Sequence, residues 1–145
     1  MNAYADTAFL CSLHAPDPHT NRVIAWLKRQ RQPLPFTGFH RLEFRNALRL
    51  RVFRREITPA QRELSIQAML SDLAAGVFAH VTAAWPEVLL EAERLSAGHS
   101  ETIGTRGLDI LHVASALVLG AEQFVTFDTR QGTLARAAGL RVPAL

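Results

Sequence analysis

A chain of 145 residues with 48% hydrophobic and 20% charged residues suits one globular domain with its own core, is too short for a second full-sized domain, and is not disordered or collagen-like. Its single cysteine, Cys11, excludes an internal disulfide, and the absence of an apolar run of roughly 18 residues or a basic signal-peptide start predicts a cytoplasmic protein without a membrane span. The net charge of +3 hides an asymmetry, because residues 1–62 carry eleven cations against four acids, whereas residues 63–145 carry five against nine.

The first half of the chain predicts two strands and four helices. A short strand over 2–5 and a helix over 7–13 are followed by a loop with Pro16 and Pro18. An amphipathic helix is expected over 20–31, a strand over 34–37 and a long helix over 41–55. Thr58-Pro59 has the capping residue and early proline of a helix start, here of a helix reaching about residue 75.

The second half continues the alternation of strands and helices. It predicts a strand over 77–81, a helix over 86–97, a glycine-rich loop over 98–104, a helix over 105–119, a strand over 123–127, a helix over 132–138 and a last strand over 140–142. Because parallel strands need crossover connections of helical length, this order predicts an α/β fold with one central parallel sheet of four to five strands, covered on both faces. Such sheets carry their functional sites at the carboxyl ends of the strands.

Four acids are expected at that edge of the sheet. Asp6 ends the first strand, Glu43 lies in the first turns of the helix after the second strand, Asp109 begins the helix after the glycine-rich loop, and Asp128 ends the strand over 123–127. Asp6, Asp109 and Asp128 also occupy positions where a carboxylate caps a helix or interacts favourably with its dipole. Each acid taken singly therefore has a structural explanation.

The helix over 105–119 favours a functional explanation for Asp109. It is apolar nearly all round, which predicts burial, and its polar residues Asp109, His112 and Ser115 recur every three positions along one side. A buried carboxylate needs a partner or a cation, and no lysine or arginine occurs between Gly107 and Val125. Arg106 is the candidate counter-ion nearest in sequence.

Four carboxylates gathered at one edge repel one another unless a cation lies among them, and a divalent ion fulfils that role best. Oxygen ligands suit Mg²⁺ or Mn²⁺, which complete their coordination with water and substrate phosphate. The acids therefore predict a metal-dependent phosphodiester site, with one or two metal ions.

Four stretches resemble the PIN-domain ribonucleases, and in particular the VapC toxins of toxin–antitoxin operons. They are Tyr4-Ala5-Asp6-Thr7, residues 43–48 (Glu43-Phe44-Arg45-Asn46-Ala47-Leu48), residues 107–114 around Asp109 and His112, and residues 124–128, which end in Asp128. The resemblance implies a three-layer α/β/α domain that spans residues 1–145, Mg²⁺- or Mn²⁺-dependent cleavage of RNA, inhibition by an antitoxin, and a homodimer.

Carried over position by position, the resemblance makes Asp6, Glu43, Asp109 and Asp128 the catalytic and metal-binding acids. Thr7 and Thr126 match hydroxyls that flank them. Two further roles stay open at this point. His112 could orient Asp109, touch substrate or fill the core, and Asn46 could bind substrate or a water beside the metal, or be a polar boundary residue.

The arginines of the helix over 41–55 are candidates for RNA binding. Arg41, Arg45 and Arg49 recur every four residues on the helix that carries Glu43, and guanidinium groups bind phosphates bidentately. The alternative is a non-catalytic nucleic-acid-binding module that uses this helix and has acids only as caps. That alternative explains the asymmetry of charge but leaves Asp109 without an explanation.

Overall fold

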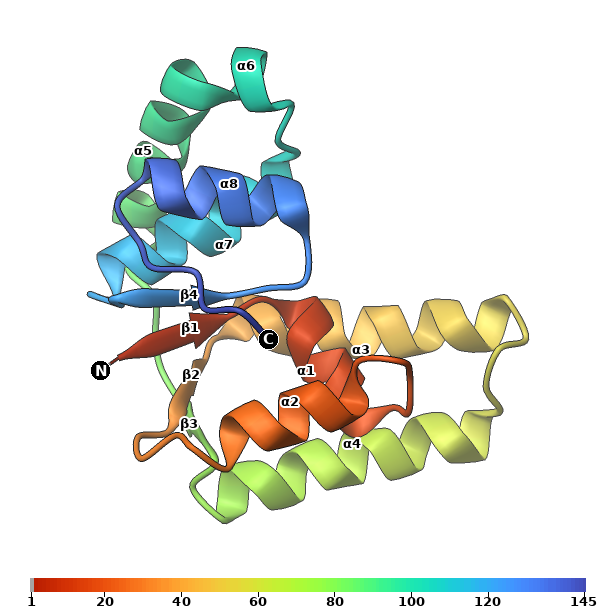
Figure 1. Cartoon of the computed structure of the whole chain (residues 1–145). Coiled ribbons are helices and arrows are strands. Elements are labelled where there is room, and N and C mark those ends of the chain that lie inside the picture. The colour runs from red at the N-terminus through yellow and green to blue at the C-terminus, as the bar shows by residue number, and fades with distance from the viewer. Residues whose placement is uncertain (1) are drawn as a thin grey trace. The chain divides into compact units, whose positions relative to one another are not determined.

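Strands and helices alternate through residues 2–145, the part of the chain that this computed structural model describes (Figure 1). The chain divides into two compact units. Unit 1 comprises residues 2–6 and 82–144, and unit 2 comprises residues 7–81 with Leu145. Within the described residues, no helix has the length and apolarity that crossing a bilayer requires.

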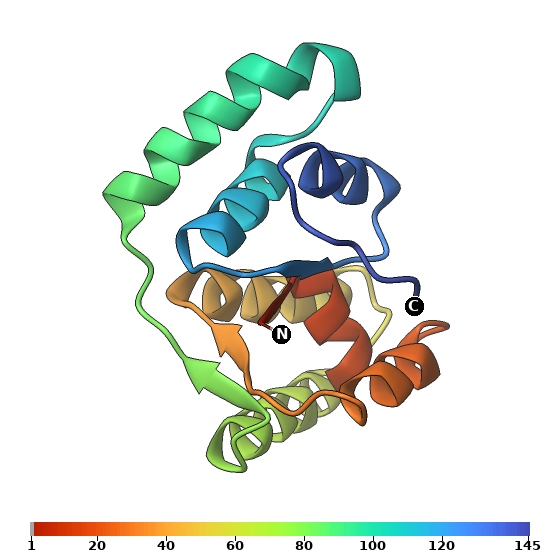
Figure 2. The same ribbon diagram turned by 60° about the vertical axis from the view of Figure 1, so that its left-hand side comes forward.

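Unit 1 is built on two parallel strands, β1 (Ala3–Ala5) and β4 (Gln123–Val125), with Tyr4 opposite Phe124. Their rings stack with centroids 5.8 Å apart, and both side chains are fully buried. Helix α5 (Trp85–Leu95) continues through a π-helical turn, η1 (Ser96–Ser100), and the short α6 (Glu101–Ile103) toward α7 (Gly107–Val118) (Figure 2). Helix α8 (Thr129–Ala137) follows β4, and together these helices bury one apolar core with the strands.

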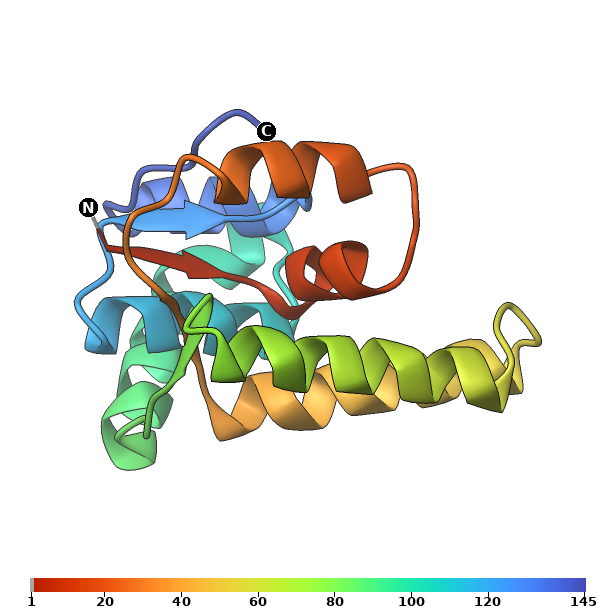
Figure 3. The same ribbon diagram turned by 90° about the horizontal axis from the view of Figure 1, so that it is seen from below.

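Unit 2 pairs β2 (Leu34–Phe36) with β3 (Phe78–His80), also in parallel, so that Leu34 lies opposite Phe78. Its helices are α1 (Thr7–His14), α2 (Thr20–Leu27), α3 (Gly38–Phe53) and α4 (Pro59–Ala74). Helices α3 and α4 lie side by side and are joined by a tight turn (Figures 1 and 3). Capping boxes at Thr37 and Thr58 satisfy the free N–H groups at the starts of these two long helices.

The parallel α/β class is confirmed, while several predicted boundaries are wrong. The helix expected over 20–31 ends at Leu27, because the N–H groups of Arg29 and Gln30 turn back to the carbonyls three residues earlier. The helix expected over 41–55 begins at Gly38, where the Thr37 cap starts it. The loop expected over 98–104 is helical as far as Ile103.

The strands also differ in detail from the expected single sheet. The described residues contain four strands in two separate pairs, β1 with β4 and β2 with β3. The last strand, expected over 140–142, is reduced to one bridge between Gln123 and Arg141, because Pro143 has no N–H with which to extend the ladder. The helix expected over 132–138 starts at Thr129, directly after its cap Asp128. Whether the whole chain acts as a single domain stays a prediction.

A buried histidine connects α1 to α4 in unit 2. The Nε2 atom of His14 lies 2.7 Å from Asp72 Oδ2, and its Nδ1 atom lies 2.9 Å from the carbonyl of Leu10. The ring also contacts Phe44 and Phe78. Asp72 of α4 thus accepts a hydrogen bond from a buried side chain of α1 and ties the two helices together.

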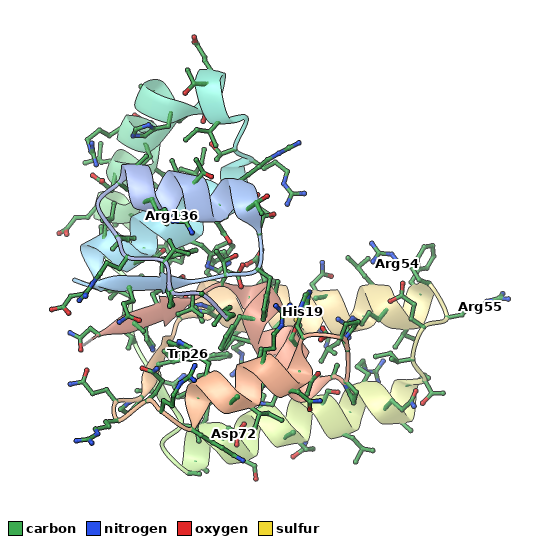
Figure 4. The ribbon with its side chains drawn as sticks, in the orientation of Figure 1. His19, Trp26, Arg54, Arg55, Asp72 and Arg136 are labelled. Carbon is green, nitrogen blue, oxygen red and sulfur yellow. The ribbon has the colours of Figure 1, made fainter. Side chains whose placement is uncertain are left out.

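Replacing Asp72 with alanine should therefore lower the free energy of unfolding by about 1–3 kcal/mol, because it leaves the buried Nε2 of His14 without an acceptor. Urea unfolding followed by the fluorescence of the two tryptophans measures the loss, and one of them, Trp26, is buried in unit 2 and labelled with Asp72 in Figure 4. The control is Ser71→Ala on the same helix, at an exposed position. Equal effects of the two substitutions would contradict a role for the His14–Asp72 contact.

Candidate metal and nucleic-acid site

Three of the four predicted acids belong to unit 1 and come from the expected ends of its elements. Asp6 directly follows β1, Asp128 lies just beyond β4, and Asp109 is in the first turn of α7. Because β1 and β4 are parallel, their carboxyl ends lie at the same edge. The N–H of Asp6 extends the ladder by donating to the carbonyl of Val125 at 3.1 Å.

The carboxylate of Asp6 is buried and is held by a hydroxyl. Only 4% of the residue is exposed, and Thr126 Oγ1 donates to its Oδ2 at 2.6 Å. The same hydroxyl oxygen lies 3.0 Å from Gln131 Oε1 and accepts from the N–H of Asp128 at 2.9 Å. Thr126 therefore fixes the carboxylate of Asp6 and the backbone at Asp128 at the same time.

Gln131 extends this network to α7. Its side chain is 1% exposed, and its Nε2 donates to the backbone carbonyl of Asp109 at 3.3 Å. Close polar contacts thus run from Asp6 through Thr126 and Gln131 to the first turn of α7, and the one proton of the Thr126 hydroxyl can be donated to either Asp6 or Gln131. Sequence reasoning missed Gln131, although its place three residues after the cap Asp128 is a signal that could have found it.

Arg106 is the counter-ion of the remaining two acids. Its Nε donates to Asp109 Oδ2 at 2.9 Å, and its Nη2 lies 4.0 Å from Asp128 Oδ2. The hydrogen bond to Asp109 raises the pKa of the guanidinium above its usual value, and the charges of Asp109 and Asp128 add to the effect. The prediction that Arg106 partners Asp109 is confirmed.

Asp128 has two roles at once. Its Oδ1 accepts from the N–H of Gln131 at 2.9 Å and caps α8, whereas its Oδ2 faces Arg106. The capping explanation is therefore correct for one oxygen and leaves the other available for a cation. Asp109 lies at the start of α7 without being its cap, since the cap position is Arg106.

Glu43, the fourth acid, belongs to unit 2 and projects from α3. Thr7 Oγ1 donates to its Oε1 at 2.7 Å. Thr7 is the first residue of α1 and is joined by one peptide bond to Asp6. The two threonines that flank the acids in sequence therefore both donate to an acid, Thr7 to Glu43 and Thr126 to Asp6.

His112 is part of the core of unit 1. It is 3% exposed, and its Nδ1 lies 2.9 Å from the hydroxyl of the fully buried Tyr4. The two rings also meet edge to face. One turn further along α7, the buried Ser115 Oγ has no hydrogen-bond partner. Of the three roles considered for His112, the described contacts support filling the core. The helix is less uniformly buried than expected, because Leu108 is 56% exposed.

The predicted RNA-binding residues lie on α3. Arg41, Arg49 and Asn46 are exposed, and Arg45 is half-buried. Arg54 and Arg55 follow at the turn after α3, where the side chain of Arg55 extends away from the ribbon (Figure 4). This face of α3 can therefore present several guanidinium groups to a polyanion.

The chemistry of the acids suits a hard divalent cation, because Asp6, Asp109 and Asp128 offer carboxylate oxygens from three elements of one unit. Within residues 2–145, however, no three His, Cys, Asp or Glu side chains are grouped closely enough to hold a metal ion. Arg106 instead offsets part of the negative charge of Asp109 and Asp128. The donor set fits the metal, and binding would require these side chains to approach one another.

The family model for the PIN domain matches residues 3–140 of this chain. The chain belongs to the PIN domain family. No curated protein matches it.

Solved structures share the fold at low identity. FitAcB from Neisseria gonorrhoeae superposes with a TM-score of 0.68 at 17% identity, over 98% of this chain and 96% of that one. VapBC2 from Rickettsia felis, bound to a DNA fragment from its promoter, gives a TM-score of 0.66 at 15% identity, over 99% and 98% of the two chains.

Replacing Thr126 with valine should lower the free energy of unfolding by about 1–3 kcal/mol, because the buried carboxylate of Asp6 loses its hydroxyl donor. Urea unfolding in EDTA measures this effect without a contribution from metal. The matched control is Thr133→Val, which removes an exposed hydroxyl that donates to a backbone carbonyl of the same unit and should change stability by less than about 0.5 kcal/mol. A Thr126→Val protein as stable as the control would mean that the hydroxyl does not hold Asp6.

Proposed function

We propose that this protein is a metal-dependent endoribonuclease that hydrolyses RNA phosphodiester bonds and is the toxin of a toxin–antitoxin pair. PIN domains are generally nucleases, and PIN nucleases typically use divalent metals. The observation that carries the proposal is the buried carboxylate of Asp6 at the end of β1, held by Thr126, together with Asp128 beyond β4 and Asp109 in the first turn of α7, which share Arg106. A purely structural role does not require acids at all three of these positions.

In this proposal Asp6, Glu43, Asp109 and Asp128 hold Mg²⁺ or Mn²⁺. The chemistry that such an ion supplies when bound is polarisation of the phosphate and a lower pKa for the attacking water. The chain contributes orientation. Thr126 donates to one oxygen of Asp6, and Thr7 donates to one oxygen of Glu43, so that each hydroxyl orients the carboxylate that it contacts.

RNA binding is assigned to Arg41, Arg45 and Arg49, with Asn46 on the same helix. Contacts from arginine to the backbone phosphates would position the RNA without reading its sequence. Helix α3 also carries Glu43, so that phosphates bound along it would lead toward one of the proposed metal ligands.

The antitoxin partner is proposed from the relatives. The similar structures FitAcB and VapBC2 carry names of toxin–antitoxin complexes, and the fold match spans nearly the whole of both chains. A homodimer and a cytoplasmic location remain predictions from the sequence.

The alternative is a nucleic-acid-binding module without catalysis. The arginines of α3 support it, and the contact of Arg106 with Asp109 and Asp128 gives two of the acids a partner without any metal. It does not account for Asp6, a buried carboxylate with a short hydroxyl contact at the end of a strand. The two functions differ in whether RNA is cut.

Asp6→Asn and Asp109→Asn should each lower Mn²⁺-dependent cleavage of a single-stranded RNA by about a hundredfold or more while RNA affinity, measured in EDTA, is kept, since each removes a charged metal ligand. Glu93→Gln, at an exposed acid of α5, is the control and should cleave like the wild type. EDTA should stop the wild-type reaction. Binding without EDTA-sensitive cleavage would favour the alternative.

Arg45→Glu should weaken the binding of single-stranded RNA and reduce the salt dependence of the binding constant, by about 0.7 in the log–log slope for each phosphate that the variant no longer neutralises. Fluorescence anisotropy over a series of salt concentrations measures both quantities. Arg31→Glu makes the same change of charge at an exposed position of the same unit and is the control. If both variants reduced the slope equally, the effect would belong to net charge and not to α3.

A further inference from the structure

Arg106 lies where a metal ion is proposed to bind. Its Nε donates to Asp109 at 2.9 Å, and its Nη2 lies 4.0 Å from the second oxygen of Asp128. Asp109 and Asp128 are two of the proposed ligands. In each of them the guanidinium faces the Oδ2 atom, which accepts no other hydrogen bond among those described. A divalent ion that took both oxygens would have to share or displace this cation.

The guanidinium is able to leave. The side chain of Arg106 is 75% exposed, compared with 21% for Asp109 and 39% for Asp128, so it reaches the acids from solvent. Its backbone occupies the cap position of α7 with an extended conformation, and no side-chain hydrogen bond caps the helix there. Rotation of the side chain away from the acids therefore breaks no helical bond.

We propose that Arg106 is a built-in counter-ion of Asp109 and Asp128, which offsets part of their negative charge before metal binds and competes with the divalent ion for their oxygens. This inference rests on the metal site of the proposed function. Its consequence is a higher metal concentration for half-saturation than the acids alone would need. Arg106 is thus a positioning residue that tunes metal affinity, and no contact of it with the reacting atoms is implied.

The direction of the effect distinguishes this role from its opposite. A competing cation lowers metal affinity, so removing its charge makes the metal bind more tightly. A residue that only held the acids in a binding arrangement would do the reverse, because its loss would let the carboxylates separate. Attraction across an exposed pair is weak in water, so the expected gain is modest, about two- to fivefold in Kd.

The chain offers a matched control in α5. Arg94 pairs with Glu91 at the same three-residue spacing as Arg106 with Asp109, in the same unit, and its side chain is 63% exposed. Arg94→Gln therefore removes the same charge and the same kind of ion pair away from the proposed ligands. Any effect of net charge on cation binding appears in both variants, and only a local effect is specific to Arg106.

The experiment is calorimetric titration of Mn²⁺ into the full-length wild type, Arg106→Gln, Arg106→Lys, Arg94→Gln and Asp109→Asn. Arg106→Gln should bind Mn²⁺ about two- to fivefold more tightly than the wild type, Arg106→Lys should lie close to the wild type, and Arg94→Gln should not change. The rise in melting temperature caused by Mn²⁺ should follow the same order and confirms that each variant is folded.

Two kinds of failure are distinguishable. If the wild type binds Mn²⁺ and Asp109→Asn weakens it, but Arg106→Gln binds no more tightly than Arg94→Gln, the competing role of Arg106 is overturned and the metal site stands. If the wild type binds no Mn²⁺, or Asp109→Asn leaves its Kd unchanged, both the metal site and this inference are overturned.

Discussion

The arrangement of unit 1 depends on keeping a charged oxygen at the buried end of a strand. Asp6 is 4% exposed, and its carboxylate is tolerated because Thr126 donates to it at 2.6 Å. That contact exists only in one register, in which Ala5 lies opposite Val125. The residues that follow, Asp6 and Thr126, are then adjacent. A shift of the strand pairing by one residue would turn the side chain of either Asp6 or Thr126 to the other face of the sheet. The stacked rings of Tyr4 and Phe124 therefore position the acid by fixing the register.

Burial decides how each acid is stabilised. Asp6, which is 4% exposed, accepts from the neutral hydroxyl of Thr126, and that hydroxyl also contacts Gln131. Asp109 and Asp128, which are partly exposed, have a cation reaching them from solvent. A guanidinium placed at Asp6 would itself have to be desolvated, and a hydroxyl placed at Asp109 would leave most of its charge without compensation. The hydroxyl suits the buried Asp6, and the guanidinium suits the partly exposed Asp109 and Asp128. Only the guanidinium is readily exchanged for another cation.

The sequence predicted what spacing and alternation can encode. Strand ends gave the positions of Asp6 and Asp128, and the polar side of α7 identified Asp109 together with its need for Arg106. The sequence could not predict contacts between residues that are distant in the chain, because spacing shows which residues share a face of an element but not which element packs against that face. The contact of His112 with Tyr4, 108 residues away, is of this kind. So is the bond between Thr7 and Glu43, whose geometry depends on how α1 packs on α3.

From the sequence, helix capping and function are alternative explanations for Asp128, but one residue can have both roles. A carboxylate has two oxygens, and α8 needs only one of them to satisfy the N–H of Gln131. The cap then orients the carboxylate, so that its second oxygen faces Arg106 without a further supporting contact. The start of α8 thus fixes a charged group at no additional cost in side-chain entropy, because the helix has already ordered it. A helix cap at the end of a parallel strand is for this reason a favourable place for a ligand, and its capping bond argues for a functional role as much as against one.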